Sequence, residues 1–66
     1  MKPFTAQEVE RILKANGFHL VSSNGSHFKW TDAEGHFVPV PHHGNRPLRQ
    51  GTLHPIFRLA GIPPPR

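Results

Sequence analysis

The stretch Asn24-Gly25-Ser26-His27-Phe28-Lys29-Trp30 is the clearest structural signal in the sequence, because it joins a tight turn to a strand. An Asn-Gly pair between runs that contain apolar residues is the strongest short-range signal of a β-hairpin, since both residues tolerate the positive φ of a type I′ turn. Successive side chains of a strand point to opposite faces, so Phe28 and Trp30 share one face. We assign these rings to the core in preference to base stacking, because a small core needs large residues. His27 and Lys29 then lie on the outward face.

The segment before the hairpin predicts a helix over residues 6–15. Thr5 and Glu8 form a capping box, in which the hydroxyl accepts from one backbone N–H and the carboxylate reaches back to the other. Gly17 suits the left-handed position just beyond a helix end. A first strand is expected over residues 18–23. The apolar stripe at helical spacing consists of Val9, Ile12 and Leu13.

Two further strands are expected after the Asn-Gly turn, over residues 26–31 and 36–40, with a polar turn between them. In the last strand Val38 and Val40 share one face. Pro39 cannot donate a backbone hydrogen bond, so this strand is expected at a sheet edge.

A basic loop over residues 41–50 leads to a second helix. Thr52 is expected as the N-cap of this helix, which puts Pro55 in the first turn, where its missing N–H costs little. Gly61 is expected to end the helix. Its apolar stripe consists of Leu53, Ile56, Phe57 and Ala60.

Together these elements predict a small α+β domain with the order α-β-β-β-α. Each helix has one apolar stripe, and packing both helices on one face of a three-stranded antiparallel sheet buries both stripes. The other face of the sheet stays open to solvent. A single domain is expected over residues 1–62, followed by an extended proline-rich tail over residues 63–66.

Length and composition exclude several kinds of site. A chain of 66 residues buries only roughly 60% of its unfolded surface, so a site must lie on one face or be completed by a partner. The chain has no cysteine, which excludes disulfides and thiolate metal sites. The six histidines include no i, i+4 pair on a predicted helix and have no acidic cluster nearby, so we expect neither a metal nor a small-molecule cofactor. Without a membrane-length apolar run or a signal-peptide pattern, a cytoplasmic protein is expected.

The charge balance favours an anionic partner. Lys plus Arg number 8 and Asp plus Glu number 4, which gives a formal charge of +4 with His neutral. In so small a domain this favours a nucleic acid or an acidic protein over solubility alone. We expect the densest basic segment to hold RNA phosphates or to contact an acidic protein. This segment contributes His42, His43, Arg46 and Arg49.

Three blocks of residues, in this order and at these spacings, carry a family resemblance. They are Gly25-Ser26-His27 in the hairpin, then Val40-Pro41-His42-His43, then Gly51-Thr52-Leu53 leading to Ile56 and Ala60-Gly61-Ile62. Together they resemble the HicA toxin family of bacterial and archaeal messenger-RNA interferases, whose fold is like the double-stranded-RNA-binding domain. The resemblance runs from the first helix through residue 62.

The resemblance implies a toxin of a type II toxin–antitoxin system. It implies an endoribonuclease that cleaves messenger RNA independently of the ribosome, arrests growth and is neutralised by a HicB-type antitoxin. It also implies that His27 is the catalytic residue and that His43 takes the histidine position of the Pro-x-His block. The chain departs from the family pattern at its C-terminus, which stops in a proline run, and at Pro55.

The chemistry of RNA cleavage fits these residues without a metal. RNA cleaves itself when its 2′-OH is deprotonated in line with the scissile phosphate, and an imidazole is a suitable base near neutral pH. We assign the role of general base to His27 and the stabilisation of charge on the phosphate to Lys29. Gly25, through its backbone, and Ser26 are expected to shape the approach to the sugar–phosphate. A lone histidine predicts a slow nuclease, which suits a toxin.

Two other functions stay open. The same fold would serve a non-catalytic RNA-binding module that recognises the shape of A-form RNA. It would also serve an interaction subunit whose basic face meets an acidic antitoxin. The variant His27→Ala separates nuclease from binder, since a pure binder tolerates it, whereas a nuclease loses cleavage while it still binds RNA.

Overall fold

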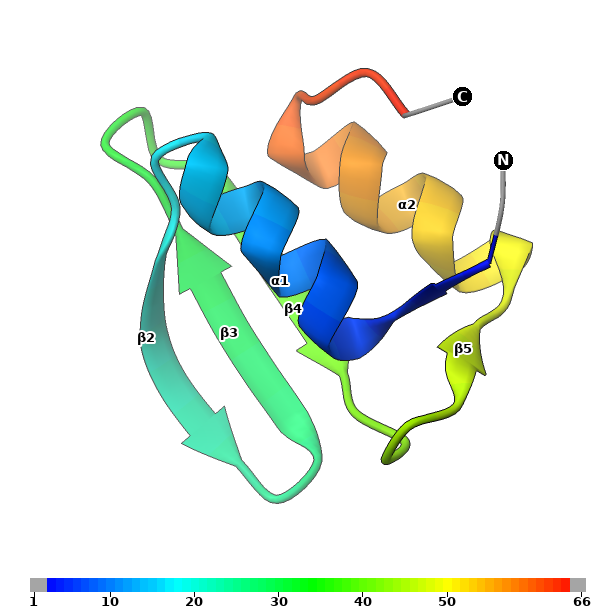
Figure 1. Ribbon diagram of the computed structural model, residues 1–66. Coiled ribbons are helices and arrows are strands. Elements are labelled where there is room, and N and C mark those ends of the chain that lie inside the picture. Colours follow the sequence, from blue (N-terminus) through cyan, green and yellow to red (C-terminus); the bar gives the residue numbers. More distant parts are fainter. Residues whose placement is uncertain (1–2, 65–66) are drawn as a thin grey trace.

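A computed structural model describes residues 3–64 of the chain (Figure 1). The expected order α-β-β-β-α is confirmed, and two short strands are added to it. Of the predicted proline-rich tail, residues 65–66 lie outside the described part, and residues 63–64 are exposed and belong to no helix or strand. The elements are β1 (Phe4–Thr5), α1 (Ala6–Ala15), β2 (His19–Asn24), β3 (His27–Thr31), β4 (Phe37–Pro41), β5 (Pro47–Leu48) and α2 (Gln50–Ala60).

Helix α1 begins and ends where the sequence predicts. Glu8 N–H donates to Thr5 Oγ1 at 3.2 Å and Thr5 N–H donates to Glu8 Oε1 at 2.9 Å, so the capping box is complete. At the other end, Gly17 has φ +88° and Phe18 N–H donates to Leu13 O at 2.9 Å. This turn brings the buried Phe18 ring back to the core beside the helix it follows.

The hairpin is present, but the predicted type I′ turn on Asn24 and Gly25 is wrong. Asn24 is paired with His27 in the ladder, so the two turn residues are Gly25 and Ser26. Gly25 has φ +63°, and among the described residues only glycines have positive φ. A single left-handed glycine at the first turn position is the arrangement of a type II′ turn. The expected strands therefore shift slightly, and Asn24 becomes a strand residue.

The three-stranded sheet has the order β2-β3-β4, with both pairs antiparallel. The edge position predicted for the strand that carries Pro39 is confirmed. Trp30 lies opposite Val38, and Phe28 lies opposite Val40, on the face that the two helices cover (Figure 1). The predicted packing of both helices on one face is therefore confirmed.

The core is formed by both helices, the covered face of the sheet and the two short strands. Both predicted apolar stripes are buried, except that Ile12 is only partly buried. The buried residues are Phe4, Ala6, Val9, Leu13, Phe18, Trp30, Val38, Val40, Leu48, Leu53, Ile56, Phe57 and Ala60. In the described part, no helix is long and apolar enough to cross a membrane.

Strand β5 lies inside the segment that the sequence predicts as a basic loop. It pairs antiparallel with β1, with Phe4 opposite Leu48. Both side chains are buried, and the Phe4 ring meets Phe57 of α2 edge-on at 6.3 Å between centroids. The pair ties the start of the described chain to the start of α2. Strands of two residues have no periodicity that a sequence can reveal.

The start of helix α2 differs from the prediction. The helix begins at Gln50 with Arg49 as N-cap, because Thr52 and Leu53 both donate their N–H to Arg49 O at 2.9 Å. The predicted N-cap role of Thr52 is therefore wrong, and Pro55 lies inside the helix, beyond its first turn. The expected end is confirmed, since Gly61 is left-handed with φ +69°.

Candidate functional site

The face of the sheet that the helices leave open carries His27 and Lys29. His27 lies opposite Asn24 of β2 and Pro41 of β4, while Lys29 lies opposite Ser22 and Pro39 in the same two strands. Since paired residues of a ladder share a face, all of these side chains project away from the helices. His27 is exposed and Lys29 is half-buried. An imidazole and an ammonium therefore stand two residues apart on one rigid strand.

His27 lies at the end of a hairpin whose turn is fixed by backbone hydrogen bonds. It is the first residue of β3 and follows the Gly25-Ser26 turn directly. His42 N–H donates to Ser26 O at 2.7 Å, so the turn is also bonded to the chain that leaves β4. Within the described residues, the His27 ring itself makes no side-chain hydrogen bond. Its ring is therefore open to a ligand, although its backbone is fixed.

Two residues of this face were not among the site residues that the sequence predicted. Asn24, treated only as a turn residue, places a side-chain amide opposite His27. Phe37 lies opposite Thr31 and is an exposed aromatic residue at the far end of the open face. The amide can donate or accept a hydrogen bond, and the ring can stack on a base. A correct assignment of the turn to Gly25 and Ser26 would have revealed the position of Asn24.

His42 lies on the other side of the sheet from His27. Its ring stacks on Phe28 at 4.0 Å between centroids, with 35° between the planes. Its buried Nε2 is 2.9 Å from Glu10 Oε2, but the ring N–H is not aligned with the carboxylate as a hydrogen bond requires. Glu10 also accepts from Trp30 Nε1 at 2.8 Å. An RNA contact by His42 stays a prediction, and this geometry favours a structural role.

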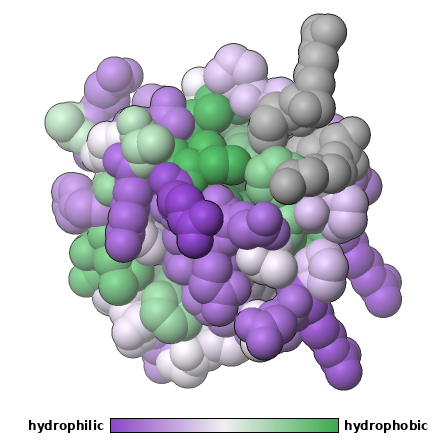
Figure 2. Space-filling view, viewed as in Figure 1, coloured by the Kyte–Doolittle hydropathy of each residue, from purple (hydrophilic) through white to green (hydrophobic). Residues whose placement is uncertain are grey.

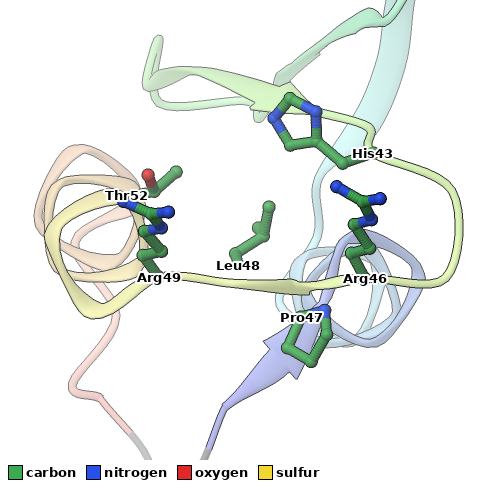
Figure 3. Close-up of a pocket in the computed structure, with 6 residues that line it drawn as sticks. All are labelled: His43, Arg46, Pro47, Leu48, Arg49 and Thr52. Carbon is green, nitrogen blue, oxygen red and sulfur yellow. The ribbon is translucent and has the colours of Figure 1, made fainter.

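The other three residues of the predicted basic segment come together. A shallow cavity of about 330 Å³ is lined by His43, Arg46, Pro47, Leu48, Arg49 and Thr52 (Figure 3). Figure 3 shows His43 and Arg46 on one side, Arg49 and Thr52 at the start of α2 on the other, and Leu48 between them. Arg46 N–H donates to His43 O at 3.2 Å across Gly44, which has φ +64°. No carboxylate is among the lining residues, so this basic pocket suits an anion such as a phosphate.

A separate cluster fixes the turn between β3 and β4, at the end of β3 away from His27. Asp32 Oδ1 accepts from the backbone N–H groups of Glu34 at 3.1 Å and His36 at 2.9 Å, and Oδ2 lies 2.7 Å from His36 Nδ1. Partial burial acts to raise the pKa of Asp32, but its hydrogen bonds with His36 outweigh this and hold the pKa below its ordinary value of 3.8. This cluster supports the strand pairing and does not belong to the open face near His27.

A candidate metal site is not formed by the residues that the structure describes. Among residues 3–64, no three side chains of His, Asp or Glu come close enough together to hold an ion. The groups that can act on a ligand are the imidazole and ammonium of the open face and the cations of the basic pocket.

Comparison with known proteins identifies the family. Among curated proteins, none matches the chain. A family model described as the HicA toxin of bacterial toxin–antitoxin systems matches residues 6–62. The matched span runs from the first residue of α1 to just beyond Gly61 and includes the hairpin, the basic pocket and α2. Because the match covers most of its 66 residues, the chain belongs to the HicA toxin family.

Proposed function

We propose that this HicA-family toxin is a metal-independent endoribonuclease that cleaves messenger RNA in the cytoplasm, with His27 as its catalytic base. Membership in the family implies a cognate antitoxin, which we take to be of the HicB type. The observation that carries the proposal is the position of His27, an exposed imidazole at the start of the central strand, on the same face as Lys29.

The proposed reaction starts with proton transfer. A ring nitrogen of His27 takes the proton of a ribose 2′-OH, and the 2′-oxygen attacks the adjacent phosphorus. The bond from phosphorus to the 5′-oxygen breaks, which leaves a 2′,3′-cyclic phosphate on one fragment and a 5′-hydroxyl on the other. The leaving oxygen takes its proton from water or from the imidazolium formed in the first step. No metal or cofactor enters this sequence.

Neighbouring groups assist the step. The Lys29 ammonium stabilises the negative charge that builds up on the phosphate oxygens during the attack. The Gly25 backbone and the Ser26 hydroxyl, at the turn before His27, shape the approach of the sugar–phosphate. This assignment matches the short distance along the chain between the turn and the proposed base.

The basic pocket gives the RNA a second point of attachment. His43 follows His42, whose N–H is bonded to Ser26 O, so the loop that carries His43 leaves the sheet next to the hairpin turn. We infer that His43, Arg46 and Arg49 hold a backbone phosphate some nucleotides away from the one that is cut. Such contacts supply affinity that falls as the salt concentration rises.

The test compares two histidines on the same face. His27→Ala should abolish growth arrest and loss of messenger RNA when expression is induced, while the purified variant still folds and binds RNA. His19→Ala is the matched control, because His19 is exposed and lies opposite Thr31 at the other end of the open face. This control should arrest growth like the wild type. Cleavage by His27→Ala at the wild-type rate would exclude the proposed base.

The chemistry can be checked on the products. A short RNA should give 2′,3′-cyclic phosphate and 5′-hydroxyl ends, with an unchanged rate in EDTA. A 2′-deoxy substitution at the cleaved position should block the reaction. Cleavage of the deoxy-substituted strand would contradict the role of the 2′-OH.

A non-catalytic RNA-binding module is the second candidate function. It is favoured by one observation, that the His27 ring has no hydrogen-bond partner within residues 3–64 to orient it. If the wild-type protein binds RNA but neither wild type nor His27→Ala cuts it, this function replaces the nuclease.

A further inference from the structure

The helices leave β2 uncovered. Leu20 and Trp30 lie directly opposite each other in the β2–β3 ladder and so share the face on which the helices pack. Trp30 is 4% exposed there, whereas Leu20 is 45% exposed. All six residues of β2 are exposed. The layer of helices therefore covers β3 but does not extend over β2.

A cavity of about 240 Å³ lies at this step. It is lined by four residues of α1 and one of β3, namely Gln7, Glu10, Arg11, Lys14 and Trp30. Leu20 does not line the cavity, but as the cross-strand neighbour of Trp30 it adds an exposed apolar side chain beside the cavity, toward the sheet edge. We call the five lining residues together with Leu20 the α1–β2 groove.

The α1–β2 groove combines the exposed apolar side chain of Leu20 with two cations of α1. Figure 2 shows hydrophobic surface over β2 beside the hydrophilic side chains of α1. Arg11 and Lys14 are exposed, and Lys14 Nζ lies 5.8 Å from the centroid of the Trp30 ring. The Glu10 carboxylate is already engaged by Trp30 Nε1 at 2.8 Å, which leaves the two cations to face an incoming partner.

The strand beside the groove carries a second exposed apolar side chain and is unpaired on its outer side. Val21 is 55% exposed and has no partner in the ladder, because the pairing skips from Leu20 to Ser22 at a bulge. In the described part of the sheet β2 pairs only with β3. Exposed apolar side chains on an edge strand are a liability that natural proteins usually cover.

We propose that the α1–β2 groove docks the cognate antitoxin, through a segment that sets an apolar side chain on Leu20 and carboxylates against Arg11 and Lys14. The charge of the groove argues for an acidic partner chain. It also argues against a second copy of this chain, since a two-fold contact would bring Arg11 and Lys14 of each copy close to the same cations of the other. The proposal requires only that the chain belongs to a toxin family with a cognate antitoxin, and it does not depend on the nuclease reaction.

The test measures binding of the purified cognate antitoxin to the full-length chain by titration calorimetry. Leu20→Ser and Lys14→Glu should each weaken binding by about tenfold or more. The matched controls lie on α2, where Leu59→Ser changes a side chain that is 49% exposed and Arg58→Glu changes an exposed cation. Both controls should bind the antitoxin within about threefold of the wild type.

A second readout separates this docking surface from the RNA site. Leu20→Ser should keep the RNA affinity of the wild type, and its thermal unfolding should show that it is folded. Wild-type antitoxin affinity in both groove variants would overturn the proposal. So would an equal loss in the α2 controls, or a loss found only with Lys29→Glu on the open face. A toxin that dimerises alone and becomes monomeric on Leu20→Ser would also overturn it, since a second copy would then fill the groove.

Discussion

The indole N–H of Trp30 donates a 2.8 Å hydrogen bond to the carboxylate of Glu10, and this bond joins α1 to the central strand of the sheet. The same carboxylate oxygen lies 2.9 Å from Nε2 of His42, the first residue after β4. One side chain therefore links the first helix, the strand that carries His27 and the loop that leads to the basic pocket.

We expect Glu10→Ala to lower the free energy of unfolding by about 1–3 kcal/mol, because it leaves the buried indole N–H of Trp30 without its acceptor. Glu10→Gln should lower the free energy of unfolding less, since its amide oxygen can still accept the hydrogen bond from Trp30. Urea unfolding measures both, with Glu34→Ala in the exposed β3–β4 turn as the control that should change little. Wild-type stability of Glu10→Ala would show that water replaces the carboxylate there.

Lys29→Gln should lower kcat for RNA cleavage by about tenfold or more while changing KM less, because its charge is needed most when the phosphate becomes more negative. Lys29→Arg should recover part of the rate. Steady-state kinetics on a short RNA test this, with Arg58→Gln on α2 as a charge-matched control. An increase in KM alone would assign Lys29 to binding.

Arg46→Gln and Arg49→Gln should each weaken RNA binding and flatten its salt dependence. Each lost phosphate contact on a single strand should reduce the slope of log K against log salt by about 0.7. Fluorescence anisotropy over a range of salt concentrations measures the slope, and Arg58→Gln, outside the basic pocket, is the control. An unchanged slope in both variants would remove the pocket from the RNA interface.

Asp32→Asn should remove a contribution to stability that depends on pH. The pKa of Asp32 is lower in the folded state than its ordinary value of 3.8, so the ionised carboxylate stabilises the fold above that value. This contribution is lost as the pH falls through the folded-state pKa. Urea unfolding measured from neutral to acid pH should give the wild type a higher free energy of unfolding than the variant at neutral pH, and the two values should converge in acid. A difference between the two free energies that stays constant with pH would contradict the role of the ionised carboxylate.

The parts of the fold that local chemistry encodes could be predicted from the sequence. Both ends of α1 follow from residues within four positions of each end, namely the Thr5–Glu8 capping box and Gly17. The inward position of Trp30 and the edge position of the strand with Pro39 follow from alternation and from a missing N–H. None of these features needs knowledge of a distant segment.

The errors occurred where a distant contact overrides a local preference. The pairing of β5 with β1 directs the chain into α2 before Thr52, so Arg49 takes the cap position that a hydroxyl would favour. The ladder between β2 and β3 extends to Asn24, so the turn uses Gly25 and Ser26 in place of an Asn-Gly pair. Glu10 is on a helix, and nothing near it in sequence indicates that an indole 20 residues away needs an acceptor.

For the candidate site, the alternation of residues along the strand was enough to predict that His27 and Lys29 share a face, because alternate side chains of a strand point the same way. The basic character of the segment that follows β4 could also be read from its residues. Which of its basic residues lie together depends on the tertiary structure. The chain turns at Gly44, which gathers His43 with Arg46 and Arg49, while the packing of His42 on Phe28 and Glu10 removes it from that group. His42 and His43 are adjacent in sequence but lie in different surroundings, because the burial of His42 against Phe28 depends on how α1 packs against the sheet.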